Sequence, residues 1–182
     1  MIEMWHGGRR WTGGPELQAP KAGRYECGPG IYLTNRYLCA QKYAKGGGVT
    51  TLVTLRDGLR WLEKTELPLQ TLKDYVRGAP GFRKREAVLD DLDHSAARVQ
   101  RDILPVSYLV NLCVYYKVLS GGQGVRLAQW LSDQGIDASL YAVNGEEQWV
   151  IVFNPSAIAQ YRAMPASQVS LEQYELPRIN LV

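Results

Sequence analysis

The sequence is poor in cysteine and histidine and has no long apolar run, which argues against several classes of protein. Its 182 residues include two histidines and three cysteines, Cys27, Cys39 and Cys113. No C-x-x-C spacing occurs and no histidine stands at ligand spacing, so we expect no metal site. No stretch approaches the roughly 18 apolar residues of a membrane span, and no charged leader precedes an apolar run. We therefore expect a cytoplasmic protein with free thiols and no membrane contact.

Both common glycine-rich phosphate motifs are also missing. No G-x-G-x-x-G follows an expected strand, and G-x-x-x-x-G-K-[ST] does not occur. The hydrophobic fraction of 46% and mean hydropathy of −0.24 are typical of a globular chain. A net charge of +3 is only mildly basic, so a nucleic-acid partner is possible but less favoured than a protein.

Aromatic residues are present in an uneven mixture. Eleven tyrosines and five tryptophans stand against two phenylalanines. Rings with a polar group suit wet clefts and interfaces better than dry cores. The composition thus favours an aromatic-lined binding cleft.

Periodicity predicts one α+β domain over residues 1–182, with two β-rich ends around a helical middle at about 66–133. The expected strands are 2–6, 31–34, 49–58, 137–143 and 148–153. The expected helices are 36–44, 66–77, 84–101, 105–119 and 123–133. Asn35 is the expected cap of the first helix, and Asn144–Gly145 the expected two-residue turn of a final hairpin.

The first strand ends in a histidine followed by two glycines, His6–Gly7–Gly8. Glycine lets a ligand amide approach the main chain, and a neutral imidazole can bond a sugar hydroxyl. Tyrosine rings offer flat faces to a heteroaromatic ring and attract a cationic one. Taken singly, each of these residues is better explained as a structural one.

Together these residues resemble the ADP-ribosyltransferases of the diphtheria-toxin and poly(ADP-ribose)-polymerase type. His6–Gly7–Gly8–Arg9 is similar to the His-Gly motif on the first strand of that family. Gly30–Ile31–Tyr32 is similar to the motif on its second strand, and Tyr43 stands eleven residues after Tyr32, as the family's second tyrosine does. The resemblance covers about residues 2–44 and 136–165, and implies a split β-sheet core in which the helical middle is an insertion.

The resemblance implies that NAD is the substrate. Tyr32 and Tyr43 would sandwich the nicotinamide, Gly7 would bind its carboxamide, and His6 would hold the adenosine ribose. The family position that gives the carboxamide a hydroxyl is Ala40 here. The residues implied at the NAD site are His6, Gly7, Gly8, Arg9, Tyr32, Thr34 and Tyr43.

The third element of the family is an acidic residue at the head of a strand. Here the strand is preceded by Glu146 and Glu147 and begins Gln148–Trp149. Alternation places Glu147 and Gln148 on opposite faces. Alignment on the following aromatic favours Gln148 as the catalytic residue with Glu147 as its substitute. The implied catalytic residues are His6, Tyr32, Gln148 and Glu147.

The resemblance implies transfer of one ADP-ribose to a macromolecule, most simply a host protein. Small members of the family include phage proteins that modify a host defence complex such as a CRISPR surveillance complex. Three alternatives remain open: a non-catalytic NAD-binding module, an NAD glycohydrolase, and an enzyme that acts on nucleic acid.

Overall fold

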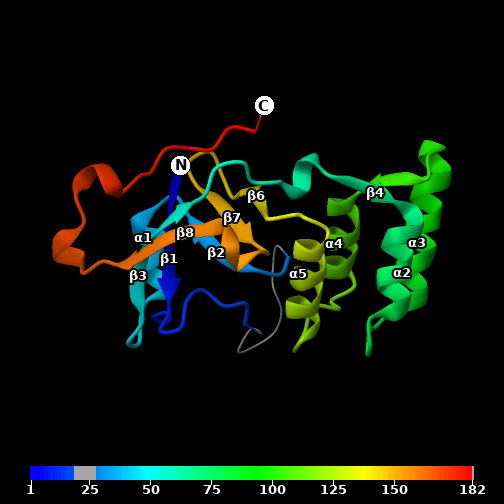
Figure 1. Ribbon diagram of the computed structural model, residues 1–182, viewed down its shortest axis with the longest axis horizontal. Coiled ribbons are helices and arrows are strands. Elements are labelled where there is room, and N and C mark those ends of the chain that lie inside the picture. Colours follow the sequence, from blue (N-terminus) through cyan, green and yellow to red (C-terminus); the bar gives the residue numbers. More distant parts are fainter. Residues whose placement is uncertain (19–27, 182) are drawn as a thin grey trace.

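The computed structural model describes residues 1–18 and 28–181. These form a mixed α/β structure around an antiparallel sheet of six strands in the order β6-β7-β2-β1-β3-β8 (Figure 1). The strands of this sheet are β1 (Ile2–Gly8), β2 (Ile31–Thr34), β3 (Val49–Leu55), β6 (Ala138–Ala142), β7 (Gln148–Val152) and β8 (Ile158–Ala163). The α+β class predicted from the sequence is therefore confirmed.

The helices gather mainly on one side of the molecule. They are α1 (Tyr37–Tyr43), α2 (Leu69–Gly78), α3 (Arg85–Val99), α4 (Val106–Tyr115) and α5 (Gln123–Asp133). The short strands β4 (Glu66–Pro68) and β5 (Ile103–Pro105) pair with each other and frame the α2–α3 pair. Figure 1 shows α4 and α5 between the sheet and that pair, while α1 lies against the strands.

The sheet has a different apolar layer on each face, as strand alternation requires. On one face, Ile151 and Phe153 join the core of α2 to α5. On the other, Met4, Ile31 and Val150 belong to a separate cluster of strand residues. A third, small cluster holds Trp5, Tyr37 and Ala40 under α1.

Most expected elements occur with altered ends. The first strand continues to Gly8 because Gly7 and Gly8 still pair with Thr50 and Val49 of β3. The helix expected to begin at 66 begins at Leu69, since β4 occupies residues 66–68. The strand β8 was not predicted; it is an edge strand with an exposed middle, so it lacks apolar alternation.

Two local predictions are wrong. Asn35 does not cap α1, whose N-cap is Arg36 without a side-chain bond. Instead, the Asn35 amide donates to the carbonyl oxygen of Glu146 and accepts from the backbone N–H of Gln148, which extends the β2–β7 contact. The hairpin exists, but its turn is longer than Asn144–Gly145, because the last paired residues are Ala142 and Gln148. Within the turn, the Asn144 side chain accepts from the N–H groups of both Glu146 and Glu147.

Candidate functional site

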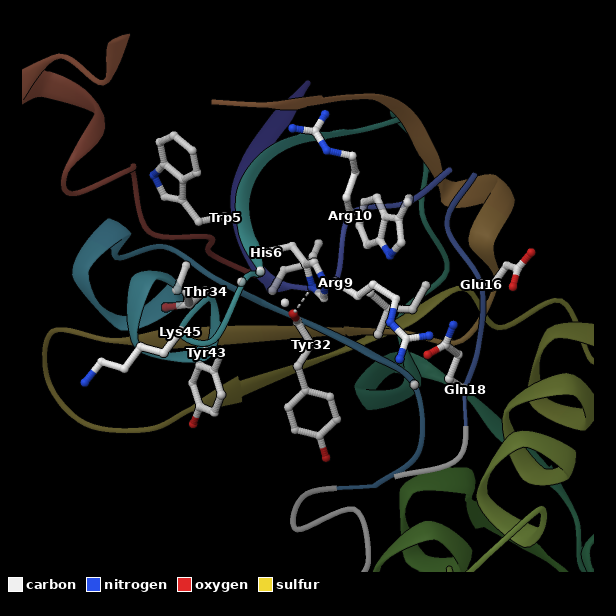
Figure 2. Close-up of a pocket in the computed structure, with 18 of the residues that line it drawn as sticks. Trp5, His6, Arg9, Arg10, Glu16, Gln18, Tyr32, Thr34, Tyr43 and Lys45 are labelled. Atoms are coloured by element: carbon white, nitrogen blue, oxygen red, sulfur yellow. Dashed lines mark hydrogen bonds between the residues drawn. The ribbon is translucent and has the colours of Figure 1, made fainter. Parts of the chain in front are cut away.

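A cleft of about 990 Å³ opens where β1 and β2 separate (Figure 2). In the described part of the chain, β1 pairs with β3 along its whole length, but its register with β2 is limited to Trp5 and Thr34. The cleft walls come from β1, the residues after it, β2, α1, the loop after α1, and Trp149 of β7. Three chain segments far apart in sequence thus meet at one opening.

His6 lies at the head of the cleft and is held in one tautomer. Its Nδ1 is 3.1 Å from the backbone carbonyl oxygen of Tyr32, so Nδ1 carries the proton and Nε2 is an acceptor. Burial lowers the pKa of His6, and the Tyr32 hydrogen bond opposes that only in part. The ring of Trp11 stacks on the imidazole with centroids 4.5 Å apart. His6 is therefore neutral at pH 7 and backed by an aromatic ring.

Gly7 is needed for the packing of α1. A Cβ at this position would lie 1.7 Å from the carbonyl oxygen of Ala40. Gly7 and Gly8 both line the cleft, as does the exposed Arg9. Ala40, buried beneath the cleft, supplies a backbone wall and no side-chain hydroxyl.

Tyr32 and Tyr43 both line the cleft, from β2 and α1. Figure 2 shows their rings projecting in the same direction. The hydroxyl of Tyr32 donates to the carbonyl oxygen of Gly28 at 2.5 Å, which fixes its ring. Tyr43 is 66% exposed and forms the outer wall. Both tyrosines that the family resemblance implied thus line one cleft.

The Glu147 carboxylate is buried against Thr34 and Trp149, which line the cleft, and is not itself one of the lining residues. Its Oε2 accepts from the Thr34 hydroxyl at 2.8 Å and from the Trp149 indole N–H at 3.1 Å. Burial disfavours its ionisation, but hydrogen bonds from Cys39, Thr34 and Trp149, together with the charge of Arg36, hold its pKa below the usual value. Glu147 is therefore ionised at neutral pH. Burial raises the pKa of the Cys39 thiol, and its hydrogen bond with Glu147 raises it further.

Gln148 does not face this part of the cleft, which corrects the register favoured from sequence. Register pairs Trp149 with Thr34, so Glu147 and Trp149 share the face of Thr34 while Gln148 points to the other. The Gln148 amide accepts from the N–H of Ile179 at 2.7 Å and donates to its carbonyl oxygen at 3.0 Å. Gln148 is thus an anchor for a later segment of the chain.

We call that segment, residues 173–181, the C-terminal strap. The Trp5 indole N–H donates to the carbonyl oxygen of Gln173, and the backbone N–H of Leu176 donates to the carbonyl oxygen of Asn35. Farther along, Arg178 donates to the carbonyl oxygen of Gly145 in the hairpin loop. The strap therefore joins β1, the end of β2 and the head of β7, the same three segments that form the candidate site.

Sequence reasoning missed several residues of the site. From the sequence, Trp149 served only as the aromatic residue on which the catalytic position was aligned, yet its side chain lines the cleft. Trp11 lies in a glycine-rich loop without periodicity, so nothing in the sequence placed its ring on His6. Lys45 and the glycines Gly46 to Gly48 form another stretch of the wall.

Among residues 1–18 and 28–181, no cluster of three or more histidine, cysteine, aspartate or glutamate residues could hold a metal ion. Cys39 and Cys113 are free thiols, and Cys27 lies outside the described residues. Within the same described ranges, no helix has both the length and the apolar character needed to cross a membrane. Comparison with protein-family models, curated proteins and solved structures gives no match.

Proposed function

We propose that this chain is an NAD-dependent mono-ADP-ribosyltransferase with an ADP-ribosyltransferase-like split sheet. One observation carries the proposal: the three motif segments that resemble this family meet at one cleft, on adjacent strands β1, β2 and β7. The third motif stands more than a hundred residues after the second, and nothing in local sequence requires them to converge. The separation of β1 from β2 supports the finer fold assignment.

The residues present fit NAD as a substrate. A cleft of about 990 Å³ can admit a dinucleotide. Tyr32 and Tyr43 offer two aromatic walls for the cationic nicotinamide ring, which gains attraction to their faces. The acceptor Nε2 of His6 suits a ribose hydroxyl. Arg9 at the cleft rim suits the diphosphate.

Glu147 is the residue of this chain best suited to the chemical step. Cleavage of the nicotinamide–ribose bond develops positive charge on the ribose, as in glycoside hydrolysis. A carboxylate kept ionised by its hydrogen bonds stabilises that charge more strongly as it grows. The tyrosines position the leaving group, and His6 orients the other end of the substrate. In this proposal Gln148 has no chemical role and anchors β7 to the C-terminal strap.

A second candidate is an NAD-binding module without catalysis. Three donors, from Thr34, Trp149 and Cys39, already engage the Glu147 carboxylate. A ribose hydroxyl would have to share or displace one of these bonds. An NAD glycohydrolase would use the same groups and let water attack.

We place the reaction in a cytoplasm, where NAD is available and free thiols such as Cys39 and Cys113 persist. The acceptor is a macromolecule of the host, and modification of a defence complex by a phage protein is one setting that suits a small chain of this type. NAD and this acceptor are the partners that the proposal requires.

Incubation with NAD labelled on its adenylate phosphate, with and without cell lysate, tests the proposal. A transferase leaves label on a macromolecule and releases nicotinamide, whereas a glycohydrolase releases free ADP-ribose. Binding of NAD without turnover supports the binding module. No binding and no turnover would refute all three.

A further inference from the structure

Three aromatic rings lie in a row across neighbouring strands beside the candidate site. Trp149 of β7 has its centroid 5.6 Å from that of Tyr32 on β2. On its other side it stacks with Tyr141 of β6, with centroids 5.9 Å and planes 29° apart. Tyr141 and Trp149 are directly opposed across the hairpin, so both rings stand on the face that carries Glu147.

This row leads from the cleft to the surface. Trp149 lines the cleft, whereas Tyr141 is 44% exposed beyond it. The indole N–H of Trp149 donates to Glu147, so the middle ring of the row touches the proposed catalytic carboxylate. A flat group that stacks on Trp149 and Tyr141 would therefore lie beside the reacting end of the cleft.

Cationic side chains outnumber carboxylates on the wall of the cleft into which the row leads, although the Glu147 carboxylate touches Trp149. Arg9, Arg10 and Lys45 line the cleft against one carboxylate, Glu16. Lys42, exposed on α1, is close enough to Cys39 to lower the pKa of that thiol. The carboxylates of the hairpin loop and the strap, Glu146 and Glu175, both pair with Arg36.

We propose that Tyr141 and Trp149 form a stacking platform for a base of a single-stranded nucleic acid, and that this base is the acceptor of ADP-ribose. Exposed aromatic rings beside a basic groove are the combination that single-stranded nucleic acids recognise. A protein acceptor needs no such row of rings, and an acidic polymer is favoured by Arg10, Lys42 and Lys45, to which NAD binding as proposed assigns no role. Three cations and one carboxylate line the cleft, although the whole chain has a net charge of only +3.

The acceptor role rests on the transferase function proposed above, whereas nucleic-acid binding does not. In the transfer, the bond between the ribose C1′ and the nicotinamide nitrogen breaks, and its electron pair leaves with nicotinamide. A nucleophilic nitrogen or oxygen of the stacked base forms the new bond to C1′. The proton lost by the base passes to the Glu147 carboxylate and then to water.

The binding test uses fluorescence anisotropy with labelled single-stranded DNA and RNA of mixed sequence, without NAD. We expect binding by the wild-type protein, weakened about 5- to 150-fold in Tyr141→Ala, the range for loss of one stacked ring. Tyr141→Phe should retain the affinity, because it keeps the ring. Tyr115→Ala is the matched control, since Tyr115 is 75% exposed on α4, outside the cleft.

Salt dependence provides a second readout of binding. The plot of log affinity against log salt should have a slope of roughly −3 if all four cations contact phosphates of a single strand. Absence of binding, or equal affinity of Tyr141→Ala and wild type with melting temperatures unchanged, would overturn the platform.

The transfer test mixes the same oligonucleotides with adenylate-labelled NAD. Label on the oligonucleotide, reduced in Tyr141→Ala while NAD consumption without acceptor is unchanged, supports the acceptor role. If NAD is consumed and only proteins of a lysate become labelled, the acceptor inference fails and the transferase proposal stands. If oligonucleotides bind but NAD is neither bound nor consumed, the proposed function fails and the platform stands.

Discussion

The Nδ1 of His6 donates to the backbone carbonyl oxygen of Tyr32 at 3.1 Å, so the imidazole of β1 is oriented by the strand that carries the first cleft tyrosine. This bond spans the point at which β1 and β2 separate. It fixes the tautomer through a backbone carbonyl group. The orientation of His6 thus depends on the backbone of β2.

The first prediction concerns His6 and pH. Because burial lowers the pKa of His6 in the folded protein, the unfolded chain binds a proton more readily. This contribution to the free energy of unfolding is therefore present above the usual value of 6.5 and is lost as pH falls from there toward the lower folded pKa. Urea unfolding from pH 7 to pH 5 should show a smaller loss of stability in His6→Asn than in wild type. Equal slopes would contradict the assignment of a neutral, buried His6.

The second prediction concerns the two tyrosines of the cleft. Tyr32→Ala and Tyr43→Ala should each weaken NAD binding by roughly 1–3 kcal/mol, as expected for loss of one face of a stacked ring. Calorimetric titration with NAD measures this. Tyr43→Ala is the cleaner variant, because its exposed ring contributes little to stability. Tyr115→Ala serves as the control, and unchanged affinity in both cleft variants would remove the sandwich.

The third prediction separates Glu147 from Gln148. Glu147→Gln should lower NAD turnover by roughly 100-fold or more, with a small change in KM, because the charge acts mainly in the transition state. Glu147 is ionised well below neutrality, so turnover should show no acid limb from this group above its usual pKa of 4.5. Initial rates of nicotinamide release from pH 5 to pH 8 provide the measurement. A fully active Glu147→Gln would exclude this carboxylate from the mechanism.

The fourth prediction concerns Gln148 as the anchor of the strap. Gln148→Ala should lower the free energy of unfolding by about 1–3 kcal/mol, since two backbone groups of Ile179 lose their partners. Gln148→Glu should also destabilise the protein, because a carboxylate cannot donate to the Ile179 carbonyl. NAD turnover per folded molecule should change little in either variant. Loss of turnover with unaltered stability would return Gln148 to the chemistry.

The fifth prediction tests the contact between β1 and α1. Gly7→Ala should destabilise the protein by roughly 3 kcal/mol or more, because its Cβ would meet the Ala40 carbonyl oxygen at 1.7 Å. Gly145→Ala is the matched control, since no atom lies within 4 Å of a Cβ at Gly145. Thermal unfolding followed by circular dichroism would distinguish them, and equal melting temperatures would show that α1 can move away.

Sequence alone predicted the α+β class, the five helices and five of the six strands of the main sheet. These elements have either clear apolar periodicity or strong flanking signals, as in α5 and in the hairpin of β6 and β7. The strand β8 lacked both, because only one side of it is paired and its side chains are largely exposed.

The site was predictable where it follows local motifs and unpredictable where it depends on long-range contacts. His6, Tyr32 and Tyr43 line the cleft as their motifs indicated. The choice between Glu147 and Gln148 depended on the Ile179 contact, 31 positions later in the chain, which no local pattern encodes. The stacking of Trp11 on His6 is likewise a tertiary contact of an irregular loop.

The strap also has a consequence for the synthesis of the protein. His6, Tyr32 and Glu147 leave the ribosome before Ile179, whose backbone bonds the Gln148 side chain at the start of β7. A nascent chain thus possesses every group proposed for NAD chemistry before the segment that fixes their arrangement exists. The order of translation therefore delays this anchoring of β7 until synthesis has passed residue 179.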